Sequence, residues 1–166
     1  MEETVLITTR KLLFGGFLFC FSLFVAALYM QHVMELEPCP LCILQRVLVM
    51  DTGIFFLIAA IHNPAKTGTK IYAGLIGLTA LLGAAVSARH VWLQSLPADQ
   101  VPSCGPGMGF IMENFPLTDA LSMVLSGSGE CAEISWTFLT LSIPAWTLLT
   151  FVGMLGLAIA AAWRQH

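Results

Sequence analysis

Charged residues are scarce in this sequence. They make up 10% of its 166 residues, whereas hydrophobic residues make up 57% and the mean hydropathy is +0.84. A soluble domain of average composition carries about 25% charged residues. A chain with so little charge cannot cover itself with a polar surface, which excludes an ordinary water-soluble domain and indicates lipid as the solvent. The formal net charge of −3 also argues against a nucleic-acid partner, because binding to phosphates depends on an excess of Lys and Arg.

Long apolar runs take the place of the missing charge. A bilayer is crossed by about 17–25 predominantly apolar residues, and each run must form a helix so that its backbone groups have partners. The first run is too long for a signal peptide and has no convincing cleavage site, so we expect it to remain as an anchor. The sequence therefore predicts an all-α membrane protein with a single domain over residues 1–166. Its four-helix up-down bundle would have spans at 12–30, 43–62, 71–88 and 144–163.

The basic residues predict the orientation of this bundle. Cytoplasmic loops of membrane proteins carry an excess of Lys and Arg. Five of the seven basic residues would lie on one side of the four spans, namely Arg10, Lys11, Lys66, Lys70 and Arg164. We therefore expect both termini in the cytoplasm of a bacterium, the protein in its inner membrane, and segments 31–42 and 91–143 on the periplasmic side.

The longer outer segment, 91–143, is polar and too short to form a core of its own. Within it, residues 116–125 place Leu117, Leu121, Val124 and Leu125 on one side of a predicted short helix. Such a helix could lie in the membrane interface, or it could pack against the bundle. The sequence leaves both alternatives open.

Five cysteines are distributed unevenly along the chain. Cys20 lies in the middle of the first span, where a free cysteine behaves as a small hydrophobic residue. The other four fall in the two segments expected outside the cytosol, where disulfides persist. They are Cys39, Cys42, Cys104 and Cys131.

The spacing of Cys39 and Cys42 allows a redox pair, half of a metal site or two inert thiols. A closed zinc site needs four ligands, and no histidine stands at ligand spacing beside this pair, so we expect no metal. Cys42 falls in the first turn of the second span, where the helix dipole and free N–H groups stabilise a thiolate. Arg46 follows one turn later on the same face. These features favour a redox pair, although Arg46 could instead extend towards the membrane surface.

Cys104 and Cys131 have glycine and proline neighbours, which make both sulfurs accessible. An exposed disulfide in a flexible segment is typically labile and catalytic. A purely structural bridge, contributing about 3–4 kcal/mol to stability, is the alternative. His90 ends the third span near the expected level of Cys42, where it could bind a ligand or serve as a polar cap.

Three groups of residues then identify a family resemblance. They occur in the order found in DsbB, the disulfide bond formation protein B family of bacterial inner membranes, and they cover most of the chain. The groups are Cys39-Pro40-Leu41-Cys42 with Gln45-Arg46, then Arg89 to Gln94, then Gly129 to Glu133 continuing through Trp136 to Trp146.

The resemblance implies an enzyme that reoxidises a periplasmic thioredoxin-like dithiol oxidase, DsbA. It implies that Cys104 forms a mixed disulfide with this donor and that Cys131 is the second member of that pair. The electrons would pass to the Cys39–Cys42 pair, and Cys42 would deliver them to ubiquinone or menaquinone.

Arg46 and His90 are implied to bind the quinone, with Arg46 also stabilising the Cys42 thiolate. Three alternatives stay open. The chain could be a DsbB-like paralogue with a dedicated partner, a metal-handling membrane protein that uses its thiols as soft ligands, or a structural four-span protein with stapled loops.

Overall fold

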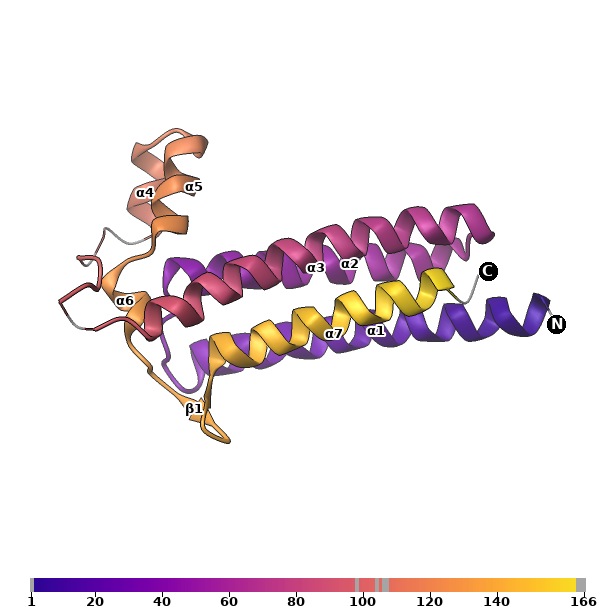
Figure 1. Cartoon of the computed structure of the whole chain (residues 1–166), viewed down its shortest axis with the longest axis horizontal. Helices are drawn as coiled ribbons and strands as arrows, with labels where there is room; N and C mark the ends of the chain where they lie inside the picture. Colours follow the sequence, from indigo (N-terminus) through magenta and orange to yellow (C-terminus); the bar gives the residue numbers. More distant parts are fainter. Residues whose placement is uncertain (1, 98, 104, 106–107, 164–166) are drawn as a thin grey trace.

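The structure, a computed structural model, describes residues 2–97, 99–103, 105 and 108–163. Four long helices lie side by side in an antiparallel bundle, and the remaining elements gather at the end opposite the two termini (Figure 1). All four are long and apolar enough to cross a membrane, which confirms the predicted four-span all-α architecture. They are α1 (Glu2–His32), α2 (Pro40–His62), α3 (Lys66–Gln94) and α7 (Ile143–Trp163).

The ends of these helices differ from the predicted spans. Helix α2 begins at Pro40 rather than at residue 43, because a proline is well suited to the first turn, where its missing N–H is not needed. Helix α3 continues to Gln94 rather than stopping near residue 88, so Arg89 and His90 lie within the helix. Hydropathy marks where a helix leaves lipid, but α3 continues past that point because its last turns pack against the outer segment.

The outer segment contains three short helices and a small hairpin. These elements are α4 (Met108–Asn114), α5 (Leu117–Ser126), α6 (Gly129–Ala132), β1 (Thr137–Phe138) and β2 (Leu141–Ser142). Helix α5 confirms the short helix predicted over 116–125, with Ala120 and Val124 buried and Leu117 and Leu121 exposed. Arg89 donates hydrogen bonds to the Leu125 and Ser126 carbonyls at the end of α5, where a cation is favourable.

The outer segment shares a core with the bundle. Val86 and Leu93 of α3 pack with Val124 of α5 in a cluster that also contains three residues of the predicted redox segments. Those three are Cys39, Leu41 and Cys131. Because the segment is too short for its own core, the upper turns of α2 and α3 supply one.

Helices α3 and α7 approach closely at Gly83. A Cβ atom at this position would overlap the ring of Phe151, which is fully buried. Small residues allow such close approach between helices in lipid, where packing rather than hydrophobic burial drives association.

We expect Gly83→Val to destabilise the bundle by about 1–3 kcal/mol, because the added methyl groups overpack this contact. The midpoint of thermal unfolding in detergent would fall accordingly. Gly74→Val is the matched control, since nothing lies within 4 Å of a Cβ at Gly74. Equal midpoints for the two variants would contradict the assigned packing.

Candidate active site

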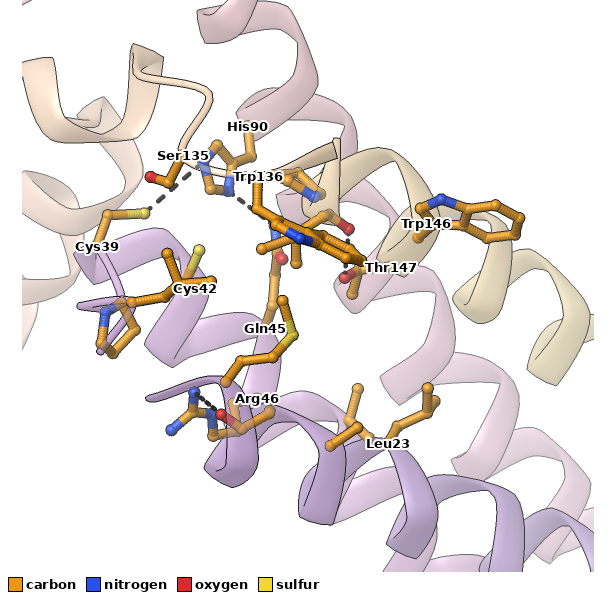
Figure 2. Close-up of a pocket in the computed structure, with 18 of the residues that line it drawn as sticks. Leu23, Cys39, Cys42, Gln45, Arg46, His90, Ser135, Trp136, Trp146 and Thr147 are labelled. Carbon is orange, nitrogen blue, oxygen red and sulfur yellow. Dashed lines mark hydrogen bonds between the residues drawn. The ribbon is translucent and has the colours of Figure 1, made fainter. Parts of the chain in front are cut away.

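A cavity of about 300 Å³ lies at the outer end of the bundle. Its walls come from α1, α2, α3 and α7 and from the segment after α6. Apolar side chains such as Leu23 and Pro144 line much of it, and Cys42, Arg46 and His90 are among its polar groups. Figure 2 shows these polar side chains projecting into the same space from α2 and α3.

Cys39 lies beside two of the other predicted redox cysteines. It is the residue immediately before α2, and Cys42 lies in the first turn of that helix. The Cys39 and Cys42 sulfurs lie within 4.8 Å of each other, and Cys39 belongs to the same buried cluster as Cys131. The structure thus brings together three of the four predicted redox cysteines, and Cys20, Cys39, Cys42 and Cys131 are free thiols.

Cys131 approaches this group from α6 and is fully buried. Its hydrogen bond with Cys39, followed by burial, raises the pKa of the Cys131 thiol above its usual range. Cys104, the predicted partner of Cys131, lies outside the described residues. Ser103 lies beside the start of α6, where its carbonyl accepts a hydrogen bond from the Gly129 N–H at 3.4 Å.

His90 contacts the thiols as well as the cavity. Its ring is 2% exposed. The Nε2 atom lies 3.0 Å from the Cys131 carbonyl oxygen and 3.7 Å from the Cys39 sulfur, and Nδ1 lies 3.2 Å from the Gln45 amide nitrogen. The sequence predicted a ligand-binding role for His90, and its closest polar partners are groups of the redox segments.

Arg46 is held against α1 on the same side of the cavity as Cys42. Its guanidinium donates hydrogen bonds to the side-chain oxygen of Gln31 and to the Ala27 carbonyl. A snorkelling arginine would extend towards water, whereas this one is half-buried and fixed at both terminal nitrogens. The cation and the Cys42 sulfur therefore share one cavity (Figure 2).

An aromatic group borders the cavity beside the β1–β2 hairpin. The rings of Trp136 and Phe138 stack with centroids 6.0 Å apart, and the Trp146 indole N–H donates to the Phe138 carbonyl at 3.0 Å. All three residues line the cavity. The sequence reasoning assigned none of them to the site, although one tryptophan shortly before a span and another in its first turn would have been a usable signal for an interfacial group.

The sulfur and nitrogen atoms of Cys39, Cys42 and His90 lie within 4.8 Å of one another. They are ligand types that zinc or copper would accept. A structural zinc site needs a fourth ligand, and the close group among the described residues contains three. The geometry is thus compatible with thiol exchange and with soft-metal binding.

Comparison with known proteins decides the family. A family model described as disulfide bond formation protein DsbB matches residues 9–161. The chain is 52% identical over 159 residues to disulfide bond formation protein B of Nitrosococcus oceani, covering 96% of this chain and 92% of that protein. It is 54% identical over 147 residues to the protein of the same name from Hahella chejuensis, covering 89% of each chain. The chain belongs to the DsbB family.

The DsbB match contains the four bundle helices from residue 9 onwards and every candidate site residue. A more distant relative, disulfide bond formation protein B 1 of Pseudomonas aeruginosa, is 43% identical over 160 residues and covers 96% of this chain and 98% of that protein. With its four apolar helices, this DsbB-family chain is a multi-pass membrane protein.

The contact between Cys39 and Cys131 predicts a pH-dependent reactivity. Because Cys39 is the main cause of the raised pKa of Cys131, we expect Cys39→Ala to move the pH midpoint of Cys131 alkylation downwards in the reduced protein. Site-specific alkylation with iodoacetamide, followed by mass spectrometry, would measure it. Cys42→Ala is the control and is expected to shift the midpoint less, and a larger shift in that variant would refute the assigned contact.

Proposed function

We propose that the protein oxidises the dithiol of a periplasmic thioredoxin-like protein of the DsbA type and passes the electrons to a membrane quinone. The observation that supports this most directly is the grouping of three cysteines. Cys131 of the outer segment shares a buried cluster with Cys39, and the Cys42 sulfur lies within 4.8 Å of the Cys39 sulfur and borders the cavity. Electrons received from a protein partner in the outer segment can therefore pass through these cysteines to a ligand in the cavity.

In each step of the proposed exchange, one disulfide bond breaks as another forms. A donor thiolate attacks Cys104 in a Cys104–Cys131 disulfide, a mixed disulfide forms at Cys104, and Cys131 leaves with the electron pair. The Cys131 thiolate attacks Cys39 in a Cys39–Cys42 disulfide, the Cys131–Cys39 bond forms, and Cys42 leaves as a thiolate. The position of Cys39 beside both other cysteines supports this order.

The residues around the cavity suit a quinone. A quinone, when bound, supplies an acceptor of two electrons and two protons. The apolar wall and the aromatic rings of Trp136 and Phe138 match its ring, and Arg46 offers a fixed donor to a carbonyl oxygen. The Arg46 charge also favours Cys42 as a thiolate. Ubiquinone and menaquinone both meet these requirements.

Energetics support a quinone as the acceptor. A DsbA-type donor has a reduction potential of about −120 mV. Such a donor is itself a strong oxidant, so typical protein disulfides, whose potentials are lower, would not reoxidise it. A quinone has the higher potential that this step requires.

The proposed orientation follows from the basic residues. Arg10, Lys11, Lys66 and Lys70 belong to the end of the bundle that carries the termini (Figure 1). Cytoplasmic loops are enriched in Lys and Arg. We therefore propose that this end is cytoplasmic in a bacterial inner membrane and that the redox segments face the periplasm.

A metal-handling function is the second candidate, because Cys39, Cys42 and His90 present soft ligand atoms close together. The two functions make different predictions for reduced protein. Stoichiometric zinc or copper in that protein, with no electron transfer to quinone, would favour the metal function.

Turnover with purified protein tests the proposal. Protein in detergent, supplied with a ubiquinone analogue and a reduced thioredoxin-like dithiol, is expected to bleach the quinone absorbance. Cys39→Ser and Cys42→Ser should reduce the rate to background, and Arg46→Gln should lower it by about 10²-fold, as expected for loss of a donor in a site of this kind.

Cys20→Ser is the matched control, because Cys20 is buried against Met154 and away from the cavity. It should retain the parental rate. Parental rates in both Cys39→Ser and Cys42→Ser would end the proposal.

A further inference from the structure

Gln45 is a buried polar residue that the proposed electron path does not use. It lies on α2, between Cys42 and Arg46 along the helix, and is 3% exposed. A polar side chain buried near lipid needs a partner. The partner of the Gln45 amide nitrogen is His90 Nδ1, at 3.2 Å, and Figure 2 shows Gln45 reaching from α2 towards the ring.

The two neighbours of the His90 ring fix where its proton lies. The Cys131 carbonyl oxygen, 3.0 Å from Nε2, can only accept a hydrogen bond, so Nε2 carries the proton. A neutral ring then has a bare Nδ1 that needs a donor, and the Gln45 amide nitrogen provides one. The Cys131 carbonyl thus sets the tautomer, and this tautomer in turn requires the Gln45 amide nitrogen, rather than its oxygen, to face Nδ1.

We propose that Gln45 is a positioning residue that holds His90 neutral, with Nε2–H directed between the Cys131 carbonyl and the Cys39 sulfur. His90 then donates a hydrogen bond to Cys39 whenever that sulfur carries negative charge. The Cys39 sulfur is 3.7 Å from Nε2 while it is a thiol. A thiolate is a stronger acceptor, because hydrogen bonds to charged groups are shorter and stronger than neutral ones.

This inference rests on the proposed function for the step in which it acts. When Cys104 is regenerated, its thiolate attacks Cys131 in the Cys131–Cys39 disulfide. The Cys104–Cys131 bond forms, the Cys131–Cys39 bond breaks, and the electron pair stays on the Cys39 sulfur. His90 stabilises this leaving thiolate by hydrogen bonding and transfers no proton. In this proposal His90 stabilises the Cys39 thiolate, whereas Arg46 stabilises the Cys42 thiolate.

Two substitutions of Gln45 should have opposite effects. In Gln45→Glu, the carboxylate can only accept, so His90 becomes protonated at both nitrogens and its positive charge favours the Cys39 thiolate. In Gln45→Met, the side chain keeps its length but loses the donor, so the ring is no longer held and Cys39 loses its hydrogen bond. A role limited to packing would impair both variants in the same direction.

The first measurement is the ring ¹⁵N spectrum of histidine-labelled, reduced protein in detergent at neutral pH, with His90 assigned by comparison with His90→Asn. We expect the parent to show a protonated Nε2 and a bare Nδ1, and Gln45→Glu to show two protonated nitrogens. A parent ring with its proton on Nδ1, or ring shifts that Gln45→Glu leaves unchanged, would overturn the proposal.

The second measurement is the pH midpoint of Cys39 alkylation in the same samples. We expect a fall of less than about one pH unit in Gln45→Glu, because the imidazolium lies nearer to the Cys39 sulfur than the new carboxylate, which partly offsets it, and a rise in Gln45→Met. Shifts of the same sign would overturn the proposal. Apart from the carboxylate that Gln45→Glu introduces, the charged and titratable groups facing this site are the same in both variants: Glu37, Cys42, Arg46, Glu130, Cys131 and Glu133.

Thr52→Val is the matched control. Thr52 is a second fully buried polar residue of α2, about two turns beyond Gln45, and it bonds to Thr79 rather than to the site. It should leave the His90 spectrum and the Cys39 midpoint at parental values. Both measurements work without quinone or donor protein, so their failure is distinguishable from failure of the proposed turnover.

Discussion

The start of α2 at Pro40 is the constraint on which the outer end of the molecule depends. Because the helix begins there, Cys39 remains outside it and Cys42 lies within its first turn. Cys39 can then meet α6 and His90 while Cys42 lies among the membrane helices, and both border the cavity. A helix that began one turn later would leave both sulfurs in a loop, without the N–H groups that favour a thiolate at a helix start.

The outer segment is fixed to this point by contacts that replace a core of its own. Arg89 binds the last carbonyls of α5, and its guanidinium lies 4.3 Å from the centre of the Trp92 ring. Ser142 of the hairpin donates to the Gln94 side chain at 2.7 Å. These partners all belong to the last turns of α3, so the helix that carries His90 also sets the position of the chain that carries Cys131. The position of Cys131 relative to His90 therefore depends on how the outer segment packs against α3.

Hydropathy was sufficient to predict the four spans, because lipid restricts each apolar run to a helix. It was not sufficient for the last turns of α3, whose polar residues face protein rather than water. The hairpin was also missed. Its turn residues Leu139 and Thr140 adopt φ of 49° and 69°, a conformation for which the sequence shows neither glycine nor asparagine. In the sequence, Gln45 is notable only as part of the motif that follows Cys42. A single polar residue in a span does not reveal which group its side chain faces.

His90 and Arg46 differ in chemistry, and their surroundings fit that difference. The sequence predicts that both bind one ligand, and both border the cavity. Helix α1 holds Arg46, whereas Gln45 and Cys131 hold His90. A permanent cation is tolerable where it has fixed acceptors and borders an open cavity. A second permanent cation beside Cys39, in a site that is almost completely buried, would carry a large desolvation cost. A neutral imidazole with an oriented N–H avoids that cost and still strengthens its bond to sulfur when charge develops there. Both ends of the dithiol border the cavity, but they suit different donors because Cys39 is buried whereas Cys42 is only half-buried.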